Sequence, residues 1–323
     1  MNRRRLIAAT AAAAALARLP IAAAQTFDHT IRVIVPFAPG GTSDILARII
    51  APELTRALGP TVVVENRPGA AGNLGADLVA KSTPDGHTLL LIDAGILATA
   101  PSLFSRLPFD VRRDLAPVTM LIYAPYFLAV HPSVPARSPA ELAAYAKANP
   151  SRVNVAHSGI GSANHLTALL LAQHWGADLT QVPYRGGAAA MTAVAAGEAQ
   201  MLVNGATATA PFIRNSQMRA IAVSGPHRLP DFPDVPTFAE LGWPATESGT
   251  WQGVLVAGAT PAPLIQRLDR EFRAVLAQPE TARRIAELGA EAKAEGPEAF
   301  RAWLQRETET WGRVIQANGI KLD

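Results

Sequence analysis

Short β-branched segments alternate with longer segments of helical period along most of this chain, and this alternation constrains the fold more than any other feature. The strand-like segments are Ile31–Val35, Val62–Val64, Leu89–Ile92, Phe127–Val130, Val153–Ala156 and Leu179–Val182. The segments with helical spacing of apolar residues are Ile45–Leu58, Leu74–Ala80, Pro139–Ala148, Ala163–Trp175 and Ala188–Ala196. Interleaved strands and helices are typical of α/β layers around mostly parallel sheets. We therefore expect an α/β fold.

The same pattern restarts in the middle of the chain, which indicates two lobes. Further strands are expected at Met201–Val203, Ala220–Val223 and Gly253–Ala257. Good helix formers fill the Ala/Arg/Glu-rich stretch from Pro261 to Ala317, which predicts solvated helices. A length of 323 residues suits about two domains. We expect a first lobe of residues 25–124 and 248–323, a second lobe of residues 125–247, and a cleft between them.

The first two dozen residues have the three parts of a secretory signal peptide. Three arginines begin the segment, an apolar run spans Leu6–Leu16, and three alanines end at Ala24. The run is too short for a membrane-spanning helix. We expect residues 1–24 to be removed after export by the general route, although the pair Arg4-Arg5 leaves a twin-arginine signal as an alternative.

Composition narrows the possible partners once this segment is set aside. The whole chain carries a formal charge of +3, but the first 24 residues hold four arginines and no acid. The remainder has 25 of the 29 basic residues against 26 acidic ones, so its charge does not favour nucleic acid. The absence of cysteine excludes disulfides, thiolate metal ligands and a lipidated cysteine anchor. No later apolar stretch predicts a membrane span in the mature chain.

Two similar glycine-rich loops carry the clearest functional signal. Each follows a strand and precedes a helix, one within Val33–Asp44 and the other within Val153–His165. Glycine lets the backbone approach a ligand, and the first N–H groups of a helix together with its dipole favour an anion. One loop in each lobe would place two anion-binding helix ends across a shared cleft. The alternative is that both are ordinary turns, in which Ser43 or Asp44 and Ser162 cap the helices.

Other routes to chemistry find little support in the sequence. A dinucleotide fingerprint around Gly159 lacks its third glycine, because Asn164 occupies that position. The seven histidines show no helical metal-ligand spacing with a nearby carboxylate, so we predict no metal site and no cofactor. An exported hydrolase of small carboxylated compounds, using Ser162 or Ser43, stays as an alternative function, although the chain has no Gly-x-Ser-x-Gly elbow and no evident base.

Several segments resemble the Bug family of solute-binding receptors, which belong to tripartite tricarboxylate transporter systems. The resemblance covers nearly the whole mature chain in order. It rests on residues 35–44, 64–73, 84–90, 159–166, 182–186, 233–237 and Trp251. It implies a non-enzymatic, monomeric periplasmic binding protein with a type II-like fold. Two α/β lobes joined by a hinge would close on a small carboxylate ligand (a di- or tricarboxylate, an amino acid, or an aromatic acid or amide) and present it to a membrane permease or, in some relatives, to a sensor.

The resemblance also implies which residues line the cleft. The first wall would be formed by Phe37, Ala38, Gly40, Gly41 and Ser43. The second wall would be formed by Ser158, Gly161, Ser162, His165 and Asn204. Tyr184 and Arg185 either edge this cleft or form a turn packed on the second lobe.

The chain departs from the family pattern at two positions near the cleft. Asp93 stands where relatives carry Ser, Thr or Asn, and Asn204 stands where they often carry Asp. A carboxylate in the cleft opposes an anionic ligand unless it meets an ammonium or amide donor. We therefore hypothesise a ligand that bears such a donor, such as an amino acid or an aromatic amide. The alternative is that Asp93 only caps the following turn.

Overall fold

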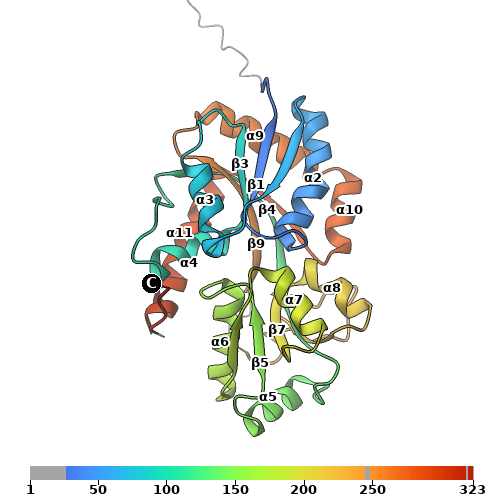
Figure 1. Cartoon of the computed structure of the whole chain (residues 1–323). Coiled ribbons are helices and arrows are strands. Elements are labelled where there is room, and N and C mark those ends of the chain that lie inside the picture. The colour runs from blue at the N-terminus through green and yellow to red at the C-terminus, as the bar shows by residue number, and fades with distance from the viewer. Residues whose placement is uncertain (1–26, 244–247, 318, 323) are drawn as a thin grey trace, which may run out of the picture.

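The computed structural model describes residues 27–243, 248–317 and 319–322. The predicted signal peptide lies outside these residues. Figure 1 shows two lobes, each with strands at its centre and helices outside, as the α/β prediction requires. The strands follow the order β2-β1-β3-β9-β4-β7-β5-β6, with β8 and β10 also paired to β4. Among the helices of the described ranges, none has the length and apolar content of a membrane span.

The first lobe is a sheet covered by helices on both faces. Its strands are β1 (Ile31–Val35), β2 (Val62–Asn66), β3 (Thr88–Asp93), β9 (Gly249–Ala257), β10 (Glu291–Glu295) and the first part of β4 (Leu115–Val130). Its helices are α2 (Thr42–Leu58), α3 (Asn73–Ala80), α4 (Ala94–Leu103), α9 (Ala262–Leu276), α10 (Pro279–Glu287) and α11 (Pro297–Ala317), with a short 3₁₀ turn η1 (Ala70–Gly72). Successive β1 side chains alternate between two cores, Val33 and Val35 in one and Ile34 in the other. Both faces are therefore apolar, as expected of a doubly covered sheet.

The second lobe repeats this construction on a smaller scale. Its strands are β5 (Asn154–His157), β6 (Thr180–Pro183), β7 (Met201–Gly205), β8 (Arg219–Val223) and the last part of β4. Its helices are α5 (Pro139–Ala148), α6 (Ala163–Trp175), α7 (Gly187–Ala195) and α8 (Ala206–Arg214). Here β5 is the central parallel strand, flanked by β6 and β7. Each lobe thus has one parallel strand–helix unit whose strand ends point toward the other lobe (Figure 1).

Two long strands connect the lobes and change the expected sheet type. β4 runs from the first lobe into the second, and β9 runs back beside it in antiparallel register, with Tyr123 opposite Trp251. Because the chain leaves the first lobe along β4 and returns along β9, these two strands must be antiparallel. The sheets are therefore mixed, whereas mostly parallel sheets were expected. The two predicted lobe boundaries meet at one point of this crossing, because Pro125 lies opposite Gly249. The lobe boundaries themselves stay a prediction.

One predicted helical region contains a strand. The stretch from Pro261 to Ala317 was expected to be helical throughout, but Glu291–Glu295 forms β10 and pairs antiparallel with β4. That expectation was wrong because pairing with β4 outweighs the helix propensity of an Ala/Glu-rich segment.

Candidate functional site

A cavity lies between the lobes, where the carboxyl ends of β1, β3, β5 and β7 meet. Ligands of α/β proteins bind at this end of parallel strands, because the strand-to-helix loops gather there. Most of the predicted cleft residues line the cavity: Phe37, Ala38, Gly41, Ser43, Asp93, Ser158, Ser162 and Asn204. Gly40, Gly161 and His165 do not line it. The fold therefore brings the two glycine loops together across one cavity, with three predicted residues placed behind or beside it.

Five helices begin at this cavity, which is more than the sequence predicted. The residues that precede their first turns, all of which line the cavity, are Gly41 (α2), Asp93 (α4), Ser162 (α6), Gly186 (α7) and Gly205 (α8). Only α4 has a side-chain cap among these five described helix starts. Helix N-termini carry partial positive charge and unpaired N–H donors. Their convergence makes the cavity an environment for a small anion.

The first loop is held by side chains of its own helix and of β9. Asp44 accepts a hydrogen bond from the Gly40 N–H (2.9 Å) and pairs with Arg48 (3.0 Å). Burial alone would raise the pKa of Asp44, but the hydrogen bonds from Arg48 and Gly40 outweigh it and lower that pKa. The Ser43 hydroxyl donates to Gln252 Oε1 (2.7 Å). Asp44 thus fixes the turn through Gly40, but neither Ser43 nor Asp44 caps α2 and Ser162 does not cap α6, so the capping that the alternative interpretation expected is wrong for both loops. Gly41 leaves the start of α2 open to the cavity.

The second loop rests on two buried, stacked histidines. His165 Nδ1 accepts from the Gly161 N–H (3.0 Å), His157 Nδ1 accepts from the Gly159 N–H (3.3 Å), and the ring centroids are 4.2 Å apart. Burial lowers the pKa of His165 to about 3 and that of His157 to about 4. Both rings are therefore neutral acceptors at pH 7. His165 and Gly161 shape the loop from behind the cavity wall.

Neither candidate nucleophile is hydrogen-bonded to an activating base among the described residues. Ser162 Oγ lies 2.6 Å from the Gly159 carbonyl oxygen and 2.5 Å from Asn164 Oδ1. Ser43 Oγ is engaged by Gln252. A serine hydrolase needs an imidazole or an equivalent base within hydrogen-bond reach of its hydroxyl. The hydrogen bonds of these described residues use both hydroxyls structurally, so the geometry does not favour the hydrolase alternative.

Asp93 both caps α4 and lines the cavity. Its Oδ1 accepts a hydrogen bond from the Gly95 backbone N–H (3.0 Å), which caps α4, and another from the Trp251 backbone N–H (3.4 Å). The side chain also lines the cavity, where burial raises its pKa to about 6 against opposing hydrogen bonds from Thr250 and the two backbone groups. No lysine or arginine of the described chain pairs with it. The cavity thus contains a carboxylate that a cationic or amide donor would satisfy.

Several cavity residues were missed by sequence reasoning. Tyr126 comes from β4, and Thr250 and Gln252 come from β9, so the crossing strands form the cavity floor. Their polar side chains within apolar strands were the available signal. Arg185 also lines the cavity and is its one cationic lining residue within the described chain. It precedes Gly186, in a third strand–glycine–helix turn that the sequence had left as either a cleft edge or a packed turn.

Two α/β lobes joined by crossing strands around an anion-receptive cavity define a two-lobed solute-binding protein. The chain belongs to the tripartite tricarboxylate transporter family of receptors, whose family model matches residues 46–320. The predicted relationship to Bug proteins is confirmed. The solved periplasmic binding protein BugD is 33% identical, with a TM-score of 0.87 over 92% of this chain and 100% of that one.

Two relatives from Rhodopseudomonas palustris were solved with carboxylates. The MatC protein with bound malate is 32% identical, with a TM-score of 0.84 over 89% of this chain and 99% of that one. A second protein, solved with adipate, is also 32% identical, with a TM-score of 0.87 over 91% of this chain and 99% of that one. The agreement therefore extends over both lobes.

Proposed function

We propose that this chain is a periplasmic receptor that captures a small carboxylate between its lobes and delivers it, chemically unchanged, to a membrane permease of the tripartite tricarboxylate type. The observation that carries the proposal is the convergence of five helix N-termini on one cavity. The malate and adipate found in relatives support the ligand class. The protein would act as a monomer, without a cofactor, after loss of residues 1–24.

The ligand-contacting residues in this proposal are those that line the cavity at the two loops, with Arg185 and the floor residues added. One ligand carboxylate would accept N–H groups at the starts of α2 and α6. Arg185 offers a second positive group at the cavity wall. Gly161 and His165 would act indirectly, by fixing the second loop.

The same proposal specifies a second ligand group. Asp93 is a cavity carboxylate that caps α4, and no lysine or arginine of the described residues pairs with it; the starts of α2, α6, α7 and α8 line the same cavity. A ligand with both a carboxylate and an ammonium or amide donor would satisfy the two ends at once. We therefore infer an amino acid or an amide-bearing acid as the preferred ligand, ahead of a plain di- or tricarboxylate.

Calorimetric titration of the mature protein, freed of co-purified ligand by unfolding and refolding, tests this inference. Glutamate is expected to bind more tightly than malate, adipate or citrate, with nicotinamide as a probe of the amide alone. The substitution Asp93→Asn keeps the oxygen that caps α4 but removes the negative charge. It should lower the affinity for glutamate and raise the affinity for malate, each by about tenfold or more. Citrate as the sole ligand would refute the donor-bearing class while leaving the receptor function intact.

Recovery of the ligand separates a receptor from the hydrolase alternative. After prolonged incubation with the protein, the bound compound is expected to be recovered unchanged by mass spectrometry. Catalytic turnover that is lost on Ser162→Ala would contradict the receptor proposal.

A further inference from the structure

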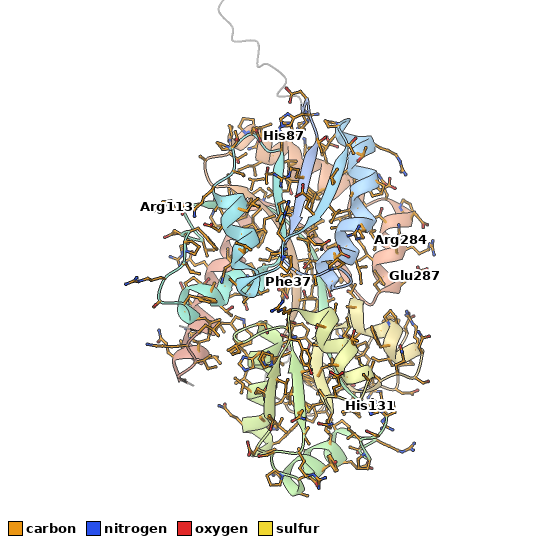
Figure 2. All side chains as sticks on the ribbon, in the orientation of Figure 1. Phe37, His87, Arg113, His131, Arg284 and Glu287 are labelled. Carbon is orange, nitrogen blue, oxygen red and sulfur yellow. The ribbon has the colours of Figure 1, made fainter. Side chains whose placement is uncertain are left out.

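Asp28, His29 and His87 form a cluster at the end of the first lobe that lies away from the cavity. Asp28 and His29 precede β1, and His87 precedes β3. The two strands are parallel neighbours with Arg32 opposite Thr88, so the residues before each strand meet at the same sheet edge. Figure 2 shows His87 at the opposite end of this lobe from Phe37, which lines the cavity. Strand pairing thus creates a group that is separate from the ligand site.

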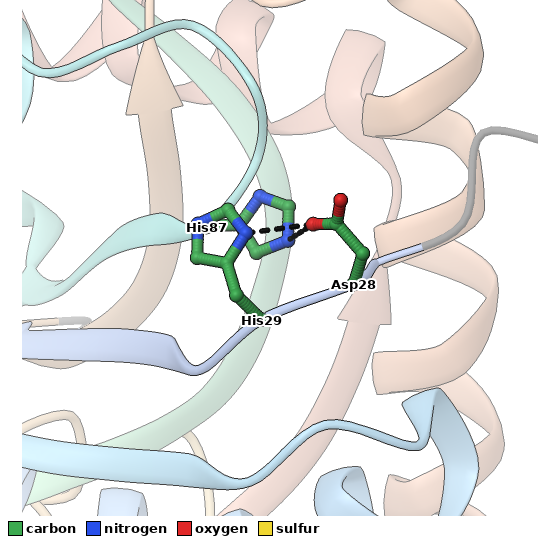
Figure 3. A group of neighbouring side chains, drawn as sticks. All are labelled: Asp28, His29 and His87. Carbon is green, nitrogen blue, oxygen red and sulfur yellow. Dashed lines mark hydrogen bonds and ion pairs between the residues drawn. The ribbon is translucent and has the colours of Figure 1, made fainter.

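The three side chains place their polar atoms close together (Figure 3). One ligand atom from each lies within 4.8 Å of the others. Asp28 Oδ1 is 2.7 Å from His29 Nδ1 and 3.5 Å from His87 Nε2. His87 is 7% exposed, and both of its ring nitrogens are buried without a hydrogen-bond partner in the described structure. Buried polar atoms of this kind are rare because they lose their hydration without compensation. A bound group that interacts with a ring nitrogen of His87 would compensate this loss.

The surroundings of His87 orient one ring nitrogen toward the cluster. Asp85 accepts a hydrogen bond from the His87 backbone N–H (2.9 Å), and its Oδ1 lies 3.3 Å from His87 Nδ1. Phe27 packs edge-on against the ring at 5.2 Å. Nε2 is left directed toward Asp28. A carboxylate beside one imidazole nitrogen, with the other nitrogen free, is the arrangement that supports histidine as a metal ligand.

We propose that Asp28, His29 and His87 bind a late first-row divalent cation, with Zn²⁺ as the best match. Two imidazole nitrogens and one carboxylate oxygen suit Zn²⁺, whereas Ca²⁺ and Mg²⁺ require oxygen ligands. His87 is the fixed ligand. His29 stacks on it with ring centroids 3.6 Å apart and planes 10° apart, so His29 must turn to direct a nitrogen at the ion. Its side chain is 60% exposed and that of Asp28 is 77% exposed, so both are free to move. Water would complete a four-coordinate site.

Helical spacing of histidines and carboxylates does not predict this site. No two of the seven histidines have that spacing with a carboxylate. His29 and His87 are 58 positions apart in the chain. The pairing of β1 with β3 brings them into contact, so the expectation of no metal site missed them.

Isothermal titration of untagged, chelator-treated mature protein with Zn²⁺ tests the proposal. One Zn²⁺ per chain is expected to bind saturably, and the melting temperature should rise with Zn²⁺ but not with Mg²⁺. Absence of saturable binding would overturn the proposal.

Substitutions locate the ion. His29→Ala and Asp28→Asn change exposed side chains, so the protein should fold normally and lose at least tenfold in Zn²⁺ affinity. Asp85→Asn should weaken binding by about 10- to 100-fold through His87. His174→Ala, an exposed histidine elsewhere, is the matched control and should bind Zn²⁺ like the parent. Unchanged affinity in His29→Ala would refute the site even if His87→Ala fails to fold.

Discussion

His157 and His165 show how a buried residue can serve this protein by staying uncharged. Each imidazole accepts a backbone N–H of the second glycine loop, and a proton on the accepting nitrogen would remove that interaction. Burial lowers both pKa values far below that of an unfolded histidine. The loop geometry is therefore linked to the protonation state of the pair, although neither ring lines the cavity.

This linkage predicts that the histidine pair costs stability as the pH falls. Below about pH 6.5 the unfolded chain takes up protons that the folded histidines refuse until about pH 4 and pH 3, so stability falls through this window. The loss per histidine at pH 5 is about 2 kcal/mol. His165→Asn keeps an acceptor for Gly161 but does not titrate. Its unfolding free energy, measured by denaturant titration, should fall less between pH 7 and pH 5 than that of the parent.

Asp93 has the opposite pH dependence, but it is present in both proteins and cancels in the comparison. The exposed His227 provides a control, and His227→Asn should retain the parental pH profile. Identical profiles for parent and His165→Asn would contradict the linkage.

At the scale of elements, the start of α6 and the end of α4 fit together across the lobes. Gly161 has φ +77°, and a Cβ at this position would overlap Leu103 Cδ1. Gly161→Ala should therefore hold the lobes apart and reduce ligand affinity by at least tenfold. Gly176→Ala is the matched control, because that glycine also has positive φ (+60°) but no atom within 4 Å of an added Cβ.

Both alanine variants should lose stability from backbone strain, a few degrees in melting temperature, but only Gly161→Ala should lose ligand affinity. Adding Leu103→Ala to Gly161→Ala removes the overlapping side chain and should restore affinity. Equal ligand affinity in the Gly161 and Gly176 variants would show that the contact between the lobes does not control binding.

The accuracy with which each helix or strand was predicted depended on its flanking residues and its burial. Helices α5 and α6 were predicted with their observed bounds, because Ser138 caps the first and Gly176 ends the second. The first part of β4 was not predicted, since Pro117 and Pro125 argue against a central strand. Helix α4 is buried almost all around and so has no polar face to give it a helical period.

The candidate site was predictable where it depends on local sequence and was missed where it depends on topology. Glycines before a helix identify both loops, so residues such as Gly41 and Ser162 could be predicted to face a cavity. Tyr126, Thr250 and Gln252 reach the same cavity only because β4 and β9 cross between the lobes. No local sequence pattern predicts that β4 and β9 cross between the lobes.

For the whole molecule, the crossing strands predict that the lobes unfold together. β4 pairs with β9 and β10 in one lobe and with β7 and β8 in the other, so neither lobe can lose this strand alone. Scanning calorimetry of the mature protein should show one transition, which moves to higher temperature as a unit when ligand is added. Two resolved transitions, or a ligand shift of part of the signal, would contradict this coupling.

The positions of the described chain ends determine where a reporter domain or a surface linker can be fused to this receptor. Near the carboxyl terminus, the Leu322 N–H donates to the Leu103 carbonyl (2.9 Å), and Leu322 borders a hollow shared with Phe37 and Arg185. The described chain begins instead at the far end of the first lobe (Figure 1). A fluorescent reporter or surface linker fused after Leu322 would thus sit beside this hollow, close to two residues of the cavity wall, whereas attachment at the amino end would lie at the opposite end of the first lobe.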